Sequence, residues 1–330
     1  AGINLSRPLD GCWGAAVNRG RGVPLTIPLR RKGLAPRRRD LSFRSAMNQS
    51  PDAHLSYCAD LVRHYDRDRF LTGLFAPPGR REALFAIYAF NHEVAKIPEV
   101  VTEPIAGQIR LQWWRESLDG VYAGQPRAHQ VAVPLAEAVT RHDLSRAHFE
   151  AILDARERDL DEMPPESLDD LEGYAAATSG ALVQLALEVL DVRDSASLTA
   201  GRHIGVAWAL IGLIRAVPFH AAQRRLMLPG DLAGQAQLDL HDLFELRRPA
   251  EVRPVVRDVA AQARAHLDTA AAHRNQVPRQ ARPALLPATL ARGYLDILAK
   301  ADHDPFDARV QMPLPGRAWR LLWASTTGRW

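Results

Sequence analysis

The sequence has very little cysteine and no long uninterrupted apolar run. Its 330 residues include two cysteines, Cys12 and Cys58, which are too few for a disulfide framework or a cysteine-based zinc site. This usage is typical of a reducing compartment. The longest apolar stretch, residues 204–214, is about half as long as a bilayer-spanning helix. We therefore interpret it as a buried helix, and we expect neither a disulfide scaffold nor a membrane-spanning chain.

Strand alternation, fixed-period repeats and glycine-rich phosphate loops are also missing. The 12 histidines show no His-x₃-His or His-Glu-x-x-His spacing, which is the spacing that helical zinc sites use. No nucleophile motif of the common hydrolases is present. These absences argue against nucleotide-binding βαβ proteins and zinc hydrolases.

Positive charge is concentrated at one end of the chain. The net charge is +4, but residues 1–46 hold ten lysines and arginines against two aspartates, a local net charge of +8. Residues 47–330 therefore carry a net charge of −4. An acidic body argues against a phosphate-backbone partner, so we expect no nucleic-acid binding.

The basic stretch 1–46 lacks helical periodicity, and we predict that it is a disordered extension. Three interpretations remain open. It could be a cleavable organelle-targeting segment, because it is rich in arginine and poor in acids. It could be a basic interaction arm, or it could be upstream sequence before a true start at Met47.

From residue 47 onward the apolar residues repeat at intervals of three and four, which predicts a single all-α domain over 47–330. Helices are expected to begin after Asp52, after Gly79, near Thr102, at Asp143 or Ser145, and at Ser167. Further helices are expected over 199–217, 254–275 and 283–300, giving about ten in total.

Several segments, in order along residues 55–300, resemble the squalene/phytoene synthase family of head-to-head prenyl transferases. They are Tyr88-Ala89-Phe90, Leu111-Gln112-Trp113-Trp114-Arg115, Leu118-Asp119-Gly120, Asp159-Leu160, Ser179-Gly180, Leu213-Ile214-Arg215 and Leu228-Pro229. The resemblance implies an isoprenoid-synthase-type helical fold. Its central cavity would be lined by helices near 84–99, 105–122, 147–161, 175–190 and 201–217.

The resemblance also implies two aspartate-rich motifs that bind Mg²⁺ and diphosphate, and this sequence departs from both. The first motif aligns with Ala95 to Glu99, and the second aligns with Ala216 to His220. Mg²⁺ requires oxygen ligands, and of these positions only Glu99 offers a carboxylate. Each segment also contains a proline, which would kink a helix interior at a cost of about 3 kcal/mol. We name no catalytic residue and expect no metal or cofactor.

The pattern of departures is similar to one branch of this family, whose members assist the assembly of respiratory complex I (NADH:ubiquinone oxidoreductase). The resemblance implies a non-catalytic protein that acts on a complex I subunit or another assembly factor. Its location would be the cytoplasmic face of a bacterial inner membrane, or the mitochondrial matrix and inner membrane. The alternatives are an active prenyl transferase that uses Mg²⁺ with Glu99, Asp154, Asp159 and Arg215, and a lipid-binding module.

The candidate ligand-binding residues all match positions of this family or lie near its motifs. They are Tyr88, His92, Glu99, Asp154, Asp159, Tyr174, Arg215 and Arg224. Arg215 and Arg224, with Arg225, His92 and His220, could form an anion pocket, or Arg215 could simply pair at a helix end. The acidic run 154–162 could bind a metal, or it could be an exposed helix joined by salt bridges such as Asp154–Arg158.

The C-terminal stretch Trp319-Arg320-Leu321-Leu322-Trp323, which precedes Trp330, combines aromatic and basic residues. This composition fits peripheral contact with a membrane interface, and it fits packing on the protein's own core equally well. The cavity could also hold an isoprenoid or another lipid.

Overall fold

The computed structural model of the chain describes residues 55–161 and 163–330, and every regular element in this part is helical. The predicted extension 1–46 lies outside the described residues. The helices are α1 (Tyr57–Tyr65), α2 (Arg67–Gly73), α3 (Pro78–Ala95), α4 (Ile97–Val100), α5 (Pro104–Tyr122), α6 (Ala132–His142), α7 (Arg146–Glu157), η1 (Arg158–Leu160), α8 (Leu168–Ala175), η2 (Ala176–Gly180), α9 (Ala181–Val189), α10 (Ser195–Arg215), α11 (Val217–Ala222), α12 (Gly230–Gln235), α13 (Leu240–Phe244), α14 (Val252–Ala272), η3 (Arg274–Gln276), η4 (Arg279–Ala281), α15 (Arg282–Leu285), α16 (Pro287–Lys300), α17 (Ala308–Gln311) and α18 (Arg317–Thr327).

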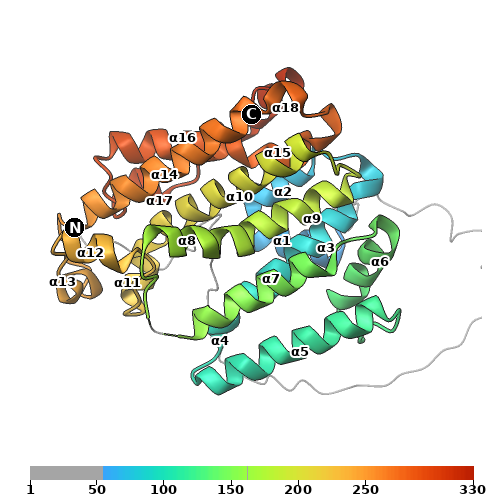
Figure 1. Cartoon of the computed structure of the whole chain (residues 1–330), viewed down its shortest axis with the longest axis horizontal. Helices are drawn as coiled ribbons and strands as arrows, with labels where there is room; N and C mark the ends of the chain where they lie inside the picture. Colours follow the sequence, from blue (N-terminus) through green and yellow to red (C-terminus); the bar gives the residue numbers. More distant parts are fainter. Residues whose placement is uncertain (1–54, 162) are drawn as a thin grey trace, which may run out of the picture.

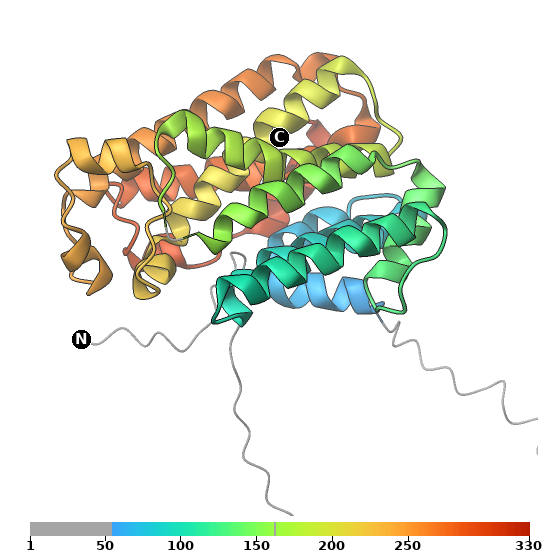
Figure 2. The ribbon, with the colours of Figure 1, turned by 60° about the horizontal axis from the view of Figure 1, so that its bottom comes forward.

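The helices form a layered bundle. Figure 1 shows α14 and α16 along one side, α5 and α6 along the other, and α3, α7, α8, α9 and α10 between them. Figure 2 keeps α5 and α6 on the side away from α14 and α16. The expected all-α fold is confirmed.

Helix α10 is the axis of the bundle and packs against α8, η2, α9, α14 and α16. It contains the apolar run 204–214 that the sequence marked as a buried helix. By length and hydropathy alone α10 could cross a bilayer, and it is the one helix in the described part of the chain with this property. Because 67% of its apolar window is buried among other helices, its hydropathy is that of a core helix.

The long helices match the predicted ones, but the expectation of about ten helices is wrong. The segments between the long helices form short helices, including α2, α4, α11 and α13. Helix α6 was missed entirely. The predicted helix from Asp143 or Ser145 through Leu160 ends earlier, because residues 158–160 tighten into the 3₁₀ turn η1.

A close crossing fixes α10 against the π-helical turn η2 (Ala176–Gly180). A Cβ atom built on Gly205 would lie 2.6 Å from the Cα of Gly180 and 2.6 Å from the carbonyl oxygen of Ser179. Only a glycine at position 205 allows this approach, which brings Ser179 beside the central helix.

Candidate functional site

Two adjoining pockets open between α3, α7, α8 and α10. About 650 Å³ in the first and about 390 Å³ in the second are not filled by protein atoms, and part of this space is open to solvent. Four residues, Ala95, Arg156, Tyr174 and Leu213, line both of them. The α1–α2 junction also lines the first pocket, whereas α5, which was expected to line the cavity, contributes no residue to either.

The two family motif segments lie at breaks between helices. Helix α3 ends at Ala95 and α4 begins at Ile97, whereas α10 ends at Arg215 and α11 begins at Val217. Pro98 and Pro218 stand in the first turn of the new helix in each case. A proline costs little there, because the first N–H groups of a helix have no intrahelical partner. The expected kink inside a helix is therefore wrong.

The segments after these breaks face each other across the second pocket. Ala95, Glu99 and His220 all line it, so three of the four motif positions come together there. The fourth, Ala216, is fully buried and lines neither pocket.

A buried cluster of Arg156, Asp159 and Tyr174 separates the two pockets. Nη1 of Arg156 donates to Oδ2 of Asp159 at 2.9 Å and to the hydroxyl of Tyr174 at 2.6 Å. The Tyr174 hydroxyl donates to the same Oδ2 at 3.0 Å. Burial raises the pKa of Tyr174, so the phenol stays protonated and remains a donor.

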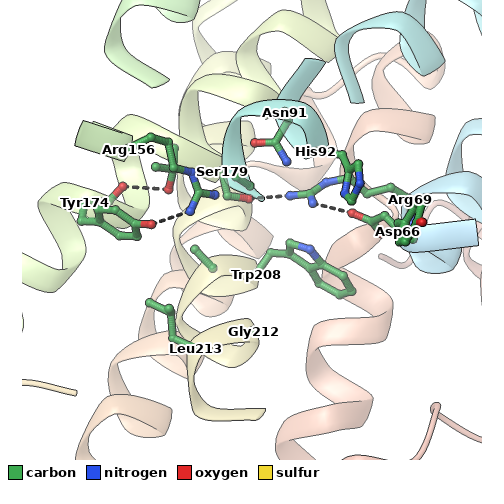
Figure 3. Close-up of a pocket in the computed structure, with 14 residues that line it drawn as sticks. Asp66, Arg69, Asn91, His92, Arg156, Tyr174, Ser179, Trp208, Gly212 and Leu213 are labelled. Carbon is green, nitrogen blue, oxygen red and sulfur yellow. Dashed lines mark hydrogen bonds and ion pairs between the residues drawn. The ribbon is translucent and has the colours of Figure 1, made fainter. Parts of the chain in front are cut away.

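A second arginine closes the opposite end of the first pocket, as Figure 3 shows. Arg69 donates to Asp66 at 2.7 Å and to the hydroxyl of Ser179 at 2.9 Å. Its guanidinium lies 6.0 Å from the ring centroid of Tyr88. Tyr88 is buried beneath it and lines neither pocket, and burial raises its pKa to about 12.

Two histidines line the pockets in their neutral form. Burial, aided by Lys96, lowers the pKa of His92 to about 4. Burial, aided by Arg225, lowers the pKa of His220 to about 4 as well. His92 stacks on Tyr65 with ring centroids 4.4 Å apart. At neutral pH neither imidazole adds positive charge.

The lining residues do not fit a cluster of Mg²⁺ ions. Mg²⁺ prefers several carboxylate and water oxygens in octahedral geometry, and the second pocket presents only Glu99 and Asp159. One oxygen of Asp159 already accepts hydrogen bonds from Arg156 and Tyr174. In the described part of the chain, no group of three or more histidine, cysteine, aspartate or glutamate side chains is placed to hold a metal ion.

Arg215 lies away from both pockets. Its Nε donates to the carbonyl of Val310 at 3.0 Å, and its guanidinium lies 4.1 Å from the ring centroid of Tyr294. The side chain is fully buried against α16 and α17. The expectation that it faces a bound diphosphate does not fit this placement, whereas pairing at a helix end does.

Asp154 and Arg224 are exposed. Asp154 pairs with Arg115 at 2.5 Å, not with Arg158 as the spacing suggested. Arg224 reaches Glu245 at 3.4 Å. The predicted anion pocket is therefore incomplete, because only Arg225, His92 and His220 of its five members line a pocket.

The sequence did not single out Asp66 and Arg69, and it favoured an exposed helix for the run that contains Arg156, whereas Trp208 belonged to the matched family segment Ala207-Trp208. Arg156 lies in an acidic run whose other charged members mostly face solvent, so its composition gave no sign of burial. At this end of the pocket the sequence signals were Ser179, which belonged to a matched family segment, and the candidate residues Tyr88 and His92.

Comparisons of the sequence with a family model and with individual proteins agree on one family. Residues 62–316 match the squalene/phytoene synthase family. The chain is 35% identical to the mouse (Mus musculus) "NADH dehydrogenase (ubiquinone) complex I, assembly factor 6" over 79% of this chain and 78% of that protein. It is 33% identical to the human (Homo sapiens) protein of the same name, over 77% of each chain. A chloroplast phytoene synthase from Zea mays is 25% identical over 78% of this chain and 62% of that protein.

Solved structures support the fold. A dehydrosqualene synthase bound to a ligand has a TM-score of 0.72, with 19% identity over 82% of this chain and 95% of that chain. The squalene synthase HpnC from Alicyclobacillus acidocaldarius has a TM-score of 0.67, with 20% identity over 76% of this chain and 94% of that chain. At this identity the likeness concerns the fold.

Proposed function

Because this chain belongs to the squalene/phytoene synthase family, we propose that it is a non-catalytic member that assists the assembly of respiratory complex I. It would be a pseudoenzyme that keeps the synthase fold and binds a complex I subunit or another assembly factor. The names of its mammalian relatives support the role in assembly.

One observation supports the absence of prenyl-transfer chemistry. Ionisation of an allylic diphosphate requires metal ions to neutralise the leaving group. Where the two motif segments meet, the chain places Ala95 and a neutral His220, and it ties Asp159 to Arg156. The remaining carboxylate of Glu99 cannot hold several divalent cations by itself.

Deletion of the gene in its own organism tests the proposal. We expect assembled complex I and its NADH:ubiquinone oxidoreductase activity to fall severalfold, whereas squalene, carotenoid and hopanoid contents stay unchanged. Blue native gels, activity assays and lipid analysis measure these outcomes.

Two complementation arms serve as controls. The wild-type gene should restore complex I, whereas an active squalene synthase expressed at the same level should not. Loss of isoprenoid lipids with intact respiration would instead establish the alternative, an active prenyl transferase.

We also propose that the protein works at a membrane surface on the inner-membrane side where complex I is assembled, and that α18 makes the contact. Trp319 and Trp323 are 76% and 66% exposed, and Leu322 lies beside them. Of the four arginines in residues 308–330, Arg309 and Arg317 pair with Asp307 and Asp68, whereas Arg320 and Arg329 are exposed. Exposed tryptophans with basic neighbours match the chemistry of an anionic lipid interface. Trp330 takes no part, because it is buried against Arg274.

Replacement of both tryptophans by alanine (W319A/W323A) should reduce binding to vesicles that contain anionic phospholipid severalfold, as measured by co-sedimentation. Point variants are preferable to truncation because Leu321 and Ala324 of α18 are buried in the fold. The matched control is I105A/I109A, which removes exposed apolar side chains from α5 on the other side of the bundle (Figure 1). Equal losses in both variants would contradict a specific role for α18.

A further inference from the structure

The second pocket contains buried polar atoms that have no hydrogen-bond partner in the protein. Asp159 is only 7% exposed, and its Oδ1 has no partner. Both ring nitrogens of His220 are likewise buried and unpartnered. Buried polar atoms are nearly always hydrogen-bonded, so these three atoms mark a place where a polar ligand group fits.

The donor and acceptor properties of these three atoms determine which polar group of a ligand can bind them. A carboxylate oxygen only accepts hydrogen bonds, whereas a neutral imidazole has one donor and one acceptor nitrogen. Because burial holds the pKa of His220 near 4, the ring is neutral at pH 7. A hydroxyl group can donate to Asp159 and accept from His220. A fully ionised phosphate group has no proton to give and cannot satisfy Oδ1 of Asp159.

The charge of the two pockets is balanced. The ionised lining side chains are three guanidinium groups and three carboxylates, namely Arg69, Arg156, Arg225, Asp66, Glu99 and Asp159. Two of the arginines are already paired within the lining, Arg69 with Asp66 and Arg156 with Asp159. A diphosphate would therefore bring uncompensated negative charge into a partly buried site, which is costly.

Apolar side chains line part of both pockets, beside the polar side chains of Asn91, Thr178, Ser179 and Gln223. Trp208 and Leu213 of α10 line the first pocket, Leu213 also lines the second, and Phe219 and Met227 complete it. Leu213 of α10 lines both pockets, so an apolar chain of the ligand can lie against it on either side of the cluster of Arg156, Asp159 and Tyr174.

We propose that this double pocket binds an uncharged amphiphile that carries a hydroxyl headgroup on an apolar chain. The hydroxyl lies between Asp159 and His220, and the chain lies against Trp208 and Leu213. The inference rests on the proposed function, because it treats the cavity as a site that binds a lipid and does not transform it. An isoprenoid alcohol and a monoacylglycerol share this chemistry.

The test is isothermal titration of the full chain with farnesol, 1-decanoylglycerol and farnesyl diphosphate, the last with and without Mg²⁺. Farnesol and its diphosphate differ only in the headgroup. We expect at least one neutral ligand to bind about tenfold more tightly than the diphosphate under both conditions, because the diphosphate buries uncompensated charge. Tighter binding of farnesol would identify the apolar part of the ligand as isoprenoid, and tighter binding of 1-decanoylglycerol would identify it as a fatty acyl group. Tighter binding of the diphosphate, or no binding of either neutral ligand, would overturn the proposal.

Replacement of His220 by phenylalanine separates the headgroup contact from general packing. The ring nitrogens make no hydrogen bond within the protein, so H220F should fold as the wild type does and bind the neutral ligand about fivefold more weakly. The exposed R224A variant is the control and should bind normally. Unchanged affinity in H220F would refute the proposed contact. If no neutral lipid binds and complex I assembly still depends on the gene, this inference alone fails and the proposed function stands.

Discussion

Replacement of Arg156 by alanine is expected to lower the free energy of unfolding by about 3–5 kcal/mol, the range found when one partner of a buried ion pair is removed. Arg156 and Asp159 are 5% and 7% exposed. Without the guanidinium, the carboxylate of Asp159 keeps the hydrogen bond donated by the hydroxyl of Tyr174. Urea unfolding followed by circular dichroism measures the loss.

The matched variant replaces the whole cluster by apolar side chains of similar volume (R156M/D159L/Y174F). Its stability should lie within a few kcal/mol of the wild type and well above that of R156A, because no buried charge is left uncompensated. An exposed ion pair contributes at most about 1 kcal/mol to the free energy of unfolding. If R156A lowers that free energy by less than this amount, the cluster is more hydrated than its burial indicates. That result would also weaken the charge balance proposed for the pockets.

Replacement of Gly205 by alanine is expected to destabilise the fold by about 3 kcal/mol, the upper part of the usual range for overpacking. The new methyl group would meet the backbone of Gly180 and Ser179 at 2.6 Å. Backbone atoms cannot rotate away as a flexible side chain can. Separation of η2 from α10 would also displace Ser179, which accepts the hydrogen bond of Arg69 at the pocket.

Gly234 in α12 provides the control for this prediction. A Cβ atom at position 234 meets nothing within 4 Å, so G234A should be neutral or stabilise the protein by about 0.5–1 kcal/mol. Thermal unfolding of the two variants under identical conditions measures the difference. Equal melting temperatures would show that α10 and η2 can separate at little cost.

Helical periodicity was sufficient to predict most long helices, because an apolar residue at every third or fourth position leaves few alternatives to an amphipathic helix. It failed for the short helices at 97–100 and 217–222, where a proline inside an apparently regular pattern starts a new helix. The ordered family segments predicted the fold, since aligned positions occupy equivalent places in related structures.

The sequence by itself determined the all-helical architecture, the family and the shortage of carboxylates at the two motif segments. Tertiary structure alone decided which charged side chains face the cavity. Helical periodicity shows that a helix has an apolar face, but it does not show which other elements pack against the helix and bury its charged side chains. Arg156 therefore looked like one member of an exposed charged run, yet it is buried beside Tyr174, which lies 18 positions along the chain. Arg215, for which the sequence left open an anion pocket or pairing at a helix end, contacts Val310 and Tyr294. These long-range contacts set the charge of the pockets, and no local pattern contains them.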